Sequence, residues 1–463
     1  MPPALMLYDT FTRARQRVRQ PKPGRPITLY VCGPTVYGRA HIGNARPAVV
    51  FDVLYRLLRH LHGAEHVRYA RNITDIDDKI MAIAVKENVD PQVVAARYEG
   101  FYVADMAALG CLTPDFTPRA TDHIAGEHGM VAMIAALVAR GFAYHVDGHV
   151  LFEVSKFDRY GELSRRPMDE MIAGARVEVA PYKRAPADFI LWKPSLADQP
   201  GWDSPWGRGR PGWHIECSAM IRSVLETETI DIHGGGLDLT FPHHENERAQ
   251  SCCAHDGAEL SRIWMHNGFL NMGETKMSKS LGNIVTPREL LDAGWDGEVL
   301  RLALLSAHYR QPLLWSDDLI YESKRRLDRL YRFRGYDSDM KTSLSGVVDS
   351  LADDLATPDA LAELSHQRDR IRPESHTLME QAKLQAGGSL LGLLKHSTDQ
   401  WFQASARGLH SIDPDLIERH VARIEALRAE KNWAAADGLR DELRAKGIEI
   451  SAARDGSVTW RKA

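Results

Sequence analysis

The chain of 463 residues is too long for one hydrophobic core, so we expect roughly two to four domains. Its composition is 44% hydrophobic and 26% charged, with a formal net charge of −4, which is ordinary for a soluble globular protein. No apolar run approaches the roughly 18 to 20 residues that span a bilayer, which argues against a membrane helix.

The five cysteines are an odd number spread over a long chain, which argues against a disulfide framework and for reduced thiols or metal ligands. The N-terminal stretch MPPALMLYDTFTRARQ has too short an apolar core for a signal peptide, and its arginines follow that core instead of preceding it. We therefore expect a cytoplasmic protein.

The first predicted elements indicate a parallel sheet. ITLYVCGPTVYG reads as a buried strand from Ile27 to Cys32 that breaks at Gly33 and Pro34. ARPAVVFDVLYRLLRHL has apolar residues at helical spacing, and HVRYARNITDIDDKI reads as a second strand that leads into an acidic helix start. Strand, helix and strand in this order predict a ligand at the carboxyl ends of the strands.

Residues 122–204 interrupt this pattern with a helix, the hairpin-like stretch YHVDGHVLFEVSKF, and loops rich in Pro and Trp. The strand-like stretches TIDIHGGGLDL and IWMHNGFLNM then resume the sheet, which predicts a discontinuous first domain. Helical patterning dominates after Pro287. ALRAEKNWAAADGLRDELRAKGIEI predicts a periodic helix near the end that Gly438 interrupts and Gly447 closes.

The stretch GGGLDLTFPHHENERAQ is a candidate metal site, because Pro242 favours a helix start and two histidines precede a glutamate. On a helix, His243 and Glu247 are offset by about 40°, and His244 and Glu247 by about 60°. The spacing favours His243 without excluding His244. Zinc takes three or four protein ligands, and Cys32 and Cys217 are the natural additions, although a buried cysteine is more often a packing residue.

Two further stretches suit a nucleotide. HIGN, from His41 to Asn44, lies between a strand and a helix, where backbone amides favour an anion. KMSKS, which contains Lys276 and Lys279, is flanked by glycines and predicts a mobile loop with two ammonium groups. Each stretch is weak alone, and the glycines of HGGGLD do not match the dinucleotide spacing.

Together these two stretches resemble the paired signature of class I aminoacyl-tRNA synthetases. YVCGPTVYGRAHIGNAR, RNITDIDDKI, GWHIECSAM, DIHGGGLDLTFPHHENERAQS, NGFLNMGETKMSKSLGN and DDLATPDA are, in this order, similar to the cysteinyl-tRNA synthetase family. The resemblance covers essentially the whole chain. It implies a Rossmann-like parallel-sheet α/β catalytic domain, a connective insertion, a helical bundle and a small anticodon-binding domain.

The resemblance implies one zinc ion per chain, held by Cys32, Cys217, His243 and Glu247. His244 and Glu245 would then have supporting or helix-surface roles. Shape alone would reject serine only modestly against cysteine, whereas zinc takes a thiolate and binds a hydroxyl poorly. No editing site is needed, so we interpret the insertion as a connective element.

The resemblance also implies that His41, Asn44, Lys276 and Lys279 are catalytic and bind ATP with Mg²⁺, and that Asp238 contacts the ribose. Thr74 and Trp213 are weaker candidates for the walls of the cysteine pocket. The cysteine carboxylate attacks the α-phosphorus of ATP, and the 3′-terminal ribose of tRNA(Cys) then attacks the adenylate. One departure is Asn44, where the family pattern commonly has histidine, because an amide cannot carry charge.

The implied domains are 1–121 and 205–286 for the two halves of the catalytic domain, 122–204 for the insertion, 287–405 for the stem-contact and helical bundle domain, and 406–463 for the anticodon-binding domain. Trp460 would stack on an anticodon base or belong to the core. The basic run at 324–334 would lie along the tRNA backbone or form a solvated helix face. We expect a monomer whose partners are tRNA(Cys), L-cysteine and ATP, with no membrane.

Two other hypotheses compete. The cysteine ligase of mycothiol biosynthesis resembles the same core and zinc set but couples cysteine to an amino sugar-inositol, and it lacks the complete anticodon-binding end. A non-catalytic tRNA-binding paralogue is more distant, and the intact KMSKS argues against it.

Overall fold

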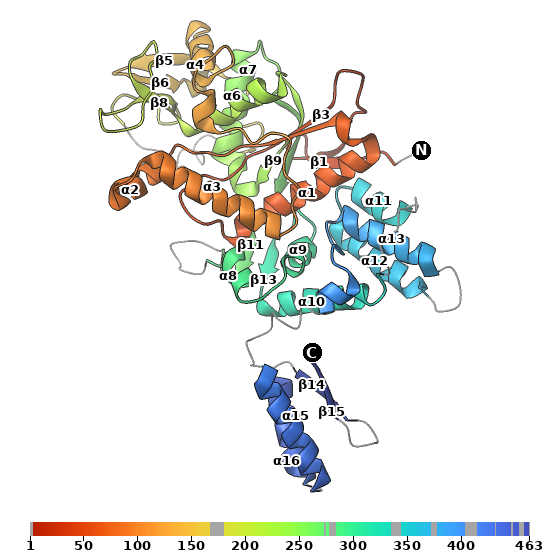
Figure 1. The fold of residues 1–463 in the computed structure, drawn as a ribbon. Coiled ribbons are helices and arrows are strands. Elements are labelled where there is room, and N and C mark those ends of the chain that lie inside the picture. Colours follow the sequence, from red (N-terminus) through yellow and green to blue (C-terminus); the bar gives the residue numbers. More distant parts are fainter. Residues whose placement is uncertain are drawn as a thin grey trace.

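The computed structural model describes residues 3–166, 180–272, 275–276, 284–334, 344–371, 377–402, 414–430, 432–445, 448–452 and 458–462 (Figure 1). No helix within these ranges is long and apolar enough to cross a bilayer.

The central sheet has four parallel strands in the order β10-β9-β3-β4. Their bounds are Ile27–Val31 for β3, Val67–Arg71 for β4, Ile230–Gly236 for β9 and Ser261–Asn267 for β10. Every residue of β3 is buried, as expected for a strand covered on both faces. The predicted parallel sheet is confirmed, and β3 pairs directly with β9 from beyond the insertion.

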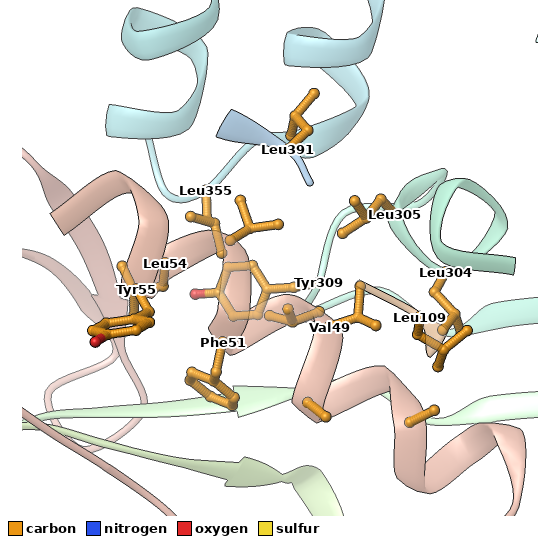
Figure 2. Packing of buried hydrophobic residues seen from close by; sticks show 14 of the residues in the cluster. Val49, Phe51, Leu54, Tyr55, Leu109, Leu304, Leu305, Tyr309, Leu355 and Leu391 are labelled. Atoms are coloured by element: carbon orange, nitrogen blue, oxygen red, sulfur yellow. The ribbon is translucent and has the colours of Figure 1, made fainter. Parts of the chain in front are cut away.

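Helix α1, Ile42–His62, connects β3 to β4 and packs against the sheet. The close approach depends on Gly234 of β9, because a Cβ atom there would lie 2.3 Å from the ring of Phe51. Figure 2 shows Val49, Phe51 and Leu54 of α1 in the core, together with Leu304, Leu305, Leu355 and Leu391 from the helical half of the chain. The first half of the sheet domain and the helices that follow it therefore share one core.

Along the chain, the residues between β4 and β9 form a second sheet, which is antiparallel with the order β5-β6-β7-β8. Its strands are Ala143–Val146, His149–Phe152, Phe189–Pro194 and Gly209–Pro211, and helix α4, Met130–Ala139, packs beside β5. Asp147 and Gly148 have φ of +48° and +76°, which gives the two-residue turn of a tight hairpin. The predicted hairpin is confirmed, and β8 lies beyond residue 204, the predicted end of the insertion.

The chain before the C-terminal elements also contains two smaller sheets and most of the helices. The N-terminal strands β1, Met6–Asp9, and β2, Ala14–Arg17, form a hairpin, and β11, Leu270–Met272, joins β12, Thr275–Lys276, and β13, Leu313–Trp315. The helices are α2 Asp78–Glu87, α3 Pro91–Ala108, α6 Trp213–Leu225, α7 Glu245–Ala254, α8 Pro287–Asp292, α9 Gly297–Leu305, α10 Asp317–Tyr331, α11 Ser345–Ala352, α12 Thr357–Arg370 and α13 Thr377–Leu390. Short 3₁₀ turns span Ala64–His66, Ala120–His123, Val154–Lys156 and Leu237–Leu239.

The C-terminal elements form a unit with a core of its own: α15 Pro414–Ala429, α16 Trp433–Ala445, β14 Ile448–Ala452 and β15 Val458–Lys462. The prediction of one periodic helix was wrong. Asn432 ends the first helix by donating its N–H to the carbonyl of Leu427 (2.8 Å), and its side chain accepts the N–H of Ala435 (3.4 Å). Helix α16 continues through Gly438, whereas Gly447 and the side chain of Trp460 lie outside the described residues.

Candidate active site

Four side chains from different parts of the chain converge near the carboxyl end of β3. Cys32 follows β3, Cys217 lies on α6, His243 precedes α7 and Glu247 lies on α7, and their donor atoms all lie within 4.8 Å of one another. The two Sγ atoms are 3.7 Å apart, and Cys217 Sγ is 3.6 Å from His243 Nε2. Cys32 Sγ is 3.4 Å and His243 Nε2 is 2.9 Å from Glu247 Oε1.

These separations fit a tetrahedral zinc site. Zinc bond lengths of about 2.3 Å to sulfur and about 2.0 Å to nitrogen place two thiolates about 3.8 Å apart, and a thiolate and an imidazole about 3.5 Å apart. The mixture of two thiols, one imidazole and one carboxylate is a donor set that zinc accepts. The residues present therefore fit a zinc ion.

The backbone that leads into α7 is helical from Pro242, as predicted, although its first turn is wide. The regular helix α7 begins at Glu245, and a wider turn spans Thr240–His244. Phe241 is the residue of that turn with extended backbone, φ −142° and ψ 133°, so the chain kinks immediately before Pro242. His243 and Glu247 lie four residues apart beyond this kink, and their side chains meet, as the helical spacing predicted.

The second histidine has different partners. His244 is fully buried, and its Nδ1 lies 2.8 Å from His266 Nε2. Its Nε2 lies 4.0 Å from Glu247 Oε1, farther than that of His243, although His244 also belongs to an overlapping group with Cys32, His233 and Glu247. The contacts of His243 with Cys217 and Glu247 favour the first histidine as the ligand.

The electrostatics of the cluster favour the anionic forms of Glu247 and Cys217, whereas burial, with Cys217 and Glu247, raises the pKa of the Cys32 thiol. Burial alone would raise the pKa of Glu247, but His233 and His243 outweigh it and hold that pKa well below its ordinary value. Burial would also raise the pKa of Cys217, yet the hydrogen bond from Cys32 and that with His243 lower it below the ordinary thiol value. A buried carboxylate beside a thiolate attracts a cation.

Sequence reasoning missed His233, which contacts one of these ligands, and it did not foresee that Trp213 stacks on another. His233 of β9 lies 2.8 Å from Glu247 through its Nε2, so the Oε1 atom of Glu247 is left facing the cluster. The ring of Trp213 stacks on His243 with centroids 4.2 Å apart. The sequence signal for His233 was its place as the first residue of HGGGLD, within a predicted strand.

A pocket of about 410 Å³ opens beside the cluster at the carboxyl ends of β3, β9 and β10. It is lined by residues that include Cys32, His41, Asn44, Trp213 and Asp238. Cys32 therefore belongs both to the donor cluster and to the wall of the pocket. Cys32 thus connects the donor cluster with the cavity that His41, Asn44 and Asp238 line.

His41 and Asn44 cap the N-terminus of α1 reciprocally. The ring Nδ1 of His41 accepts the N–H of Asn44 (3.2 Å), and the amide oxygen of Asn44 accepts the N–H of His41 (3.3 Å). Asn44 thus has a structural reason to be an amide. In the same turn Ile42 donates its N–H to the carbonyl of Val285 (2.8 Å), and Gly43 lines the pocket at the helix N-terminus, where the helix dipole favours an anion.

The other predicted site residues are placed differently. Thr74 is buried, its hydroxyl donates to Glu216 Oε2 (2.9 Å), and it is not among the residues that line the pocket. Lys276 lies in β12, but its side chain and all of Lys279 fall outside the described residues. Asn267, which we did not predict, lines the pocket, and its Oδ1 has no hydrogen-bond partner among the described residues.

The fold is similar to those of solved aminoacyl-tRNA synthetases. Methionyl-tRNA synthetase of Mycobacterium tuberculosis in complex with methionyl-adenylate matches with a TM-score of 0.55 at 17% identity, over 81% of this chain and 93% of that chain. The leucyl-tRNA synthetase of Agrobacterium radiobacter, in a ternary complex, also gives 0.55, at 11% identity over 84% and 86%. The family model of the class I tRNA synthetase (C) catalytic domain matches residues 18–325. The sheet and its site are those of a class I aminoacyl-tRNA synthetase.

Curated relatives show to which family within this class the chain belongs. The cysteine–tRNA ligase of Parvibaculum lavamentivorans is 54% identical over 99% of this chain and 98% of its own, and that of Maricaulis maris is 50% identical over 99% of both. The enzyme of the same name from Xanthomonas campestris is 52% identical over the full length of both chains. The chain belongs to the cysteine–tRNA ligase family. The predicted resemblance is confirmed, and these relatives favour neither competing hypothesis.

Proposed function

We propose that this enzyme joins L-cysteine to tRNA(Cys) in two steps that use ATP, through a cysteinyl-adenylate, and that a zinc ion selects the substrate thiol. The single observation that carries the proposal is the position of Cys32, which belongs to the zinc-type donor cluster and also lines the pocket that contains His41 and Asp238. A substrate whose sulfur reaches the cluster would thereby present its carboxylate to the nucleotide.

Cys32, Cys217, His243 and Glu247 would hold the zinc ion. When bound, zinc supplies an affinity for the thiolate of cysteine that the hydroxyl of serine does not match. Trp213, stacked on His243 and 40% exposed, would form the wall between this site and the pocket. Cys217, His243 and Glu247 are buried and Cys32 is half-buried, which would limit the access of competing water to the thiol.

Activation needs an in-line approach of the cysteine carboxylate to the α-phosphorus, with departure of pyrophosphate. The capped N-terminus of α1 would receive the phosphates, with His41 and Asn44 at their side. Asp238, exposed at the end of β9, would contact the ribose. Lys276 and Lys279 would add positive charge, and Mg²⁺ would accompany the nucleotide.

In the second step a hydroxyl of the 3′-terminal ribose of the tRNA would attack the carbonyl carbon of the cysteinyl-adenylate, forming the ester and releasing AMP. Part of the basic run on α10 suits the RNA backbone, because Arg325, Arg329 and Arg332 are exposed at spacings of four and three. Two members of the run do not suit it. Lys324 pairs with Asp328 at 2.6 Å, and Arg334 is buried and donates to a backbone carbonyl.

A charging assay tests the proposed function. We expect radiolabelled cysteine to become attached to tRNA(Cys) in the presence of ATP, and we expect excess unlabelled serine not to compete. An amino sugar-inositol acceptor in place of tRNA serves as the comparison. Transfer to the amino sugar and not to the tRNA, or absence of any cysteine-dependent pyrophosphate exchange, would contradict the proposal. The monomeric state and the bounds of the five predicted segments stay predictions.

A further inference from the structure

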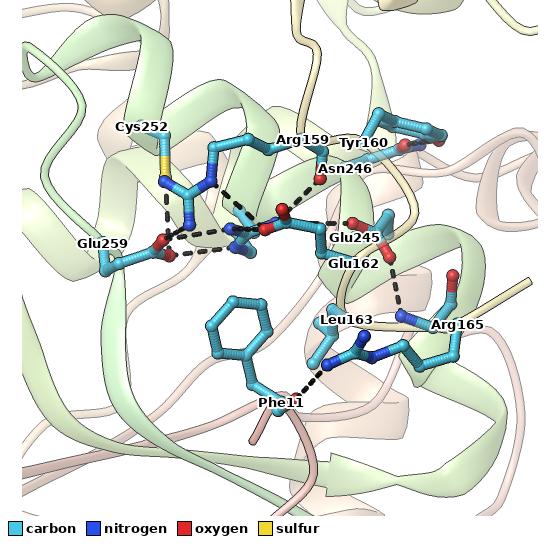
Figure 3. Close-up of polar contacts among 12 residues, drawn as sticks. Phe11, Arg159, Tyr160, Glu162, Leu163, Arg165, Glu245, Asn246, Cys252 and Glu259 are labelled. Carbon is cyan, nitrogen blue, oxygen red and sulfur yellow. Dashed lines mark hydrogen bonds and ion pairs between the residues drawn. The ribbon is translucent and has the colours of Figure 1, made fainter. Parts of the chain in front are cut away.

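Helix α7, which carries Glu247, is held by a buried arginine next to that residue. Arg248 is fully buried, and its Nε lies 2.9 Å from Glu259 Oε2. One terminal nitrogen donates to Glu162 (2.8 Å), and the other donates to the backbone carbonyl of Arg159 (3.0 Å). Figure 3 shows Arg159, Glu162 and Glu259 gathered in this network. Arg248 thus joins α7 to the predicted insertion.

Two more residues of α7 contact the same segment of the insertion. The backbone N–H of Ser164 donates to Glu245 Oε2 (2.8 Å), and the hydroxyl of Tyr160 donates to the amide oxygen of Asn246. Residues 159–164 therefore contact α7 at positions 245, 246 and 248 (Figure 3). Glu247 is the remaining side chain of this turn, and it points into the donor cluster.

The opposite side of α7 is fixed to α6. Gln250 Nε2 donates to the carbonyl of His214 (2.8 Å) and to Ser218 Oγ (3.1 Å), the latter beside Cys217. The helix is therefore held between the segment 159–164 and the helix that bears another presumed ligand. Losing the contacts on one side would let α7 shift relative to α6, and so change the distance between Glu247 and Cys217.

A purely structural role would not need this arrangement. A buried ion pair is weak as a source of stability, because desolvation of both charges offsets their attraction. Its value lies in geometry: Arg248 uses three nitrogens on two carboxylates and one carbonyl, which fixes both the rotation and the axial position of α7. Metal ligation is sensitive to that geometry, because residues that orient ligands affect metal affinity about 10- to 100-fold.

We propose that Arg248 is a positioning residue for Glu247, and that the segment 159–164 acts through it to set how tightly the enzyme holds its metal and its cysteine. The inference rests on the proposed function, because it presupposes the zinc site. It gives the insertion a role in substrate selection that is separate from connecting the two halves of the sheet.

The test compares Arg248→Met with the unaltered enzyme. Methionine keeps an unbranched apolar stem but loses every hydrogen bond of the guanidinium. We expect the zinc dissociation constant, measured by competition with a chelator, to rise about 10-fold. The KM for cysteine in pyrophosphate exchange should rise with it, while the KM for ATP stays unchanged. Arg248→Lys keeps the charge and should recover part of the zinc affinity.

Two further variants make the outcome decisive. Glu162→Gln removes the negative charge of one half-exposed partner of Arg248, and it should shift zinc affinity in the same direction by a smaller factor even if Arg248→Met does not fold. Arg184→Met breaks an ion pair with Glu153, which is also in the insertion but away from α7, and should change neither quantity.

A lowered melting temperature with unchanged zinc affinity and unchanged KM for cysteine, in both Arg248→Met and Glu162→Gln, would overturn the inference and leave Arg248 a structural residue. An unaltered enzyme that binds no zinc would instead overturn the zinc site of the proposed function. The two failures are therefore distinguishable.

Discussion

Cys32→Ser is expected to lower the zinc content of the enzyme and its affinity for cysteine together. The thiol lies 3.7 Å from Cys217 Sγ and 3.4 Å from Glu247 Oε1, and a serine hydroxyl there would be a far poorer zinc ligand. We expect kcat/KM for cysteine to fall at least about 100-fold. The KM for ATP should change little, because the capping contacts of His41 do not involve Cys32.

Metal analysis and pyrophosphate exchange at varied cysteine and ATP are the measurements. Cys111→Ser makes the same atomic change at a thiol that lies outside the donor cluster and should retain zinc. If Cys32→Ser kept one zinc per chain at unaltered affinity, Cys32 would not be a ligand. If zinc were lost but cysteine were bound as before, the metal would not recognise the thiol.

Arg301→Met is expected to lower the free energy of unfolding by about 3 to 5 kcal/mol, more than any other substitution that we name. Arg301 of α9 is fully buried and forms an ion pair with Asp52 of α1. It also donates to the carbonyls of Leu391 (2.7 Å) and Leu109 (3.2 Å). The substitution leaves Asp52 buried with Arg56 as its remaining ion-pair partner (2.8 Å), and it leaves two carbonyls without their donor.

Urea unfolding of the unaltered enzyme and of the variant gives the difference in the free energy of unfolding. Arg15→Met, which removes an exposed ion pair with Asp353, should cost less than about 1 kcal/mol. The double variant with Asp52→Asn should recover part of the loss, because no uncompensated charge is then buried. A cost for Arg301→Met no larger than that for Arg15→Met would show that Asp52 is solvated or compensated otherwise.

The ion pair between Arg301 and Asp52 makes the folding stability depend on pH. Burial would raise the pKa of Asp52, but Arg301 and Arg56 outweigh burial and lower that pKa below its ordinary value. A carboxyl group with a lowered folded-state pKa contributes its full stability above the unfolded-state pKa of about 4, and loses it as the pH falls through the folded-state value. The difference between the unaltered enzyme and Asp52→Asn should therefore shrink on acidification.

The parts of the fold with strong local patterns were predictable from the sequence. The apolar run at 27–31, the helical spacing of Val49, Val53 and Leu57, and the Asp-Gly turn at 147–148 each encode their element locally, and each is confirmed. The helical backbone that leads into α7 likewise begins at Pro242, directly after the extended Phe241, although the wide turn at Thr240–His244 was not predictable. Asn432, by contrast, divides a pattern that looked continuous.

The candidate site, too, was predictable from the sequence only in part. Motifs identified Cys32, Cys217 and His243, but their convergence joins Cys32 and Cys217 across 185 positions of the chain, which no local pattern encodes. The partners that orient the ligands were invisible for the same reason. His233 and Arg248 act through contacts with distant elements, and the hydroxyl of Thr74 faces Glu216 and not the pocket, as only the packing reveals.

Substitution of the metal by cobalt(II) provides the most direct test of thiol selection, because thiolate ligands give cobalt an intense charge-transfer absorption. The cobalt-loaded enzyme should already show the absorption of Cys32 and Cys217, and addition of cysteine should increase it, as one more thiolate reaches the metal. Serine at the same concentration should leave the spectrum unchanged. A spectrum that cysteine does not alter, although cysteine is bound and activated, would contradict recognition of the substrate through the metal.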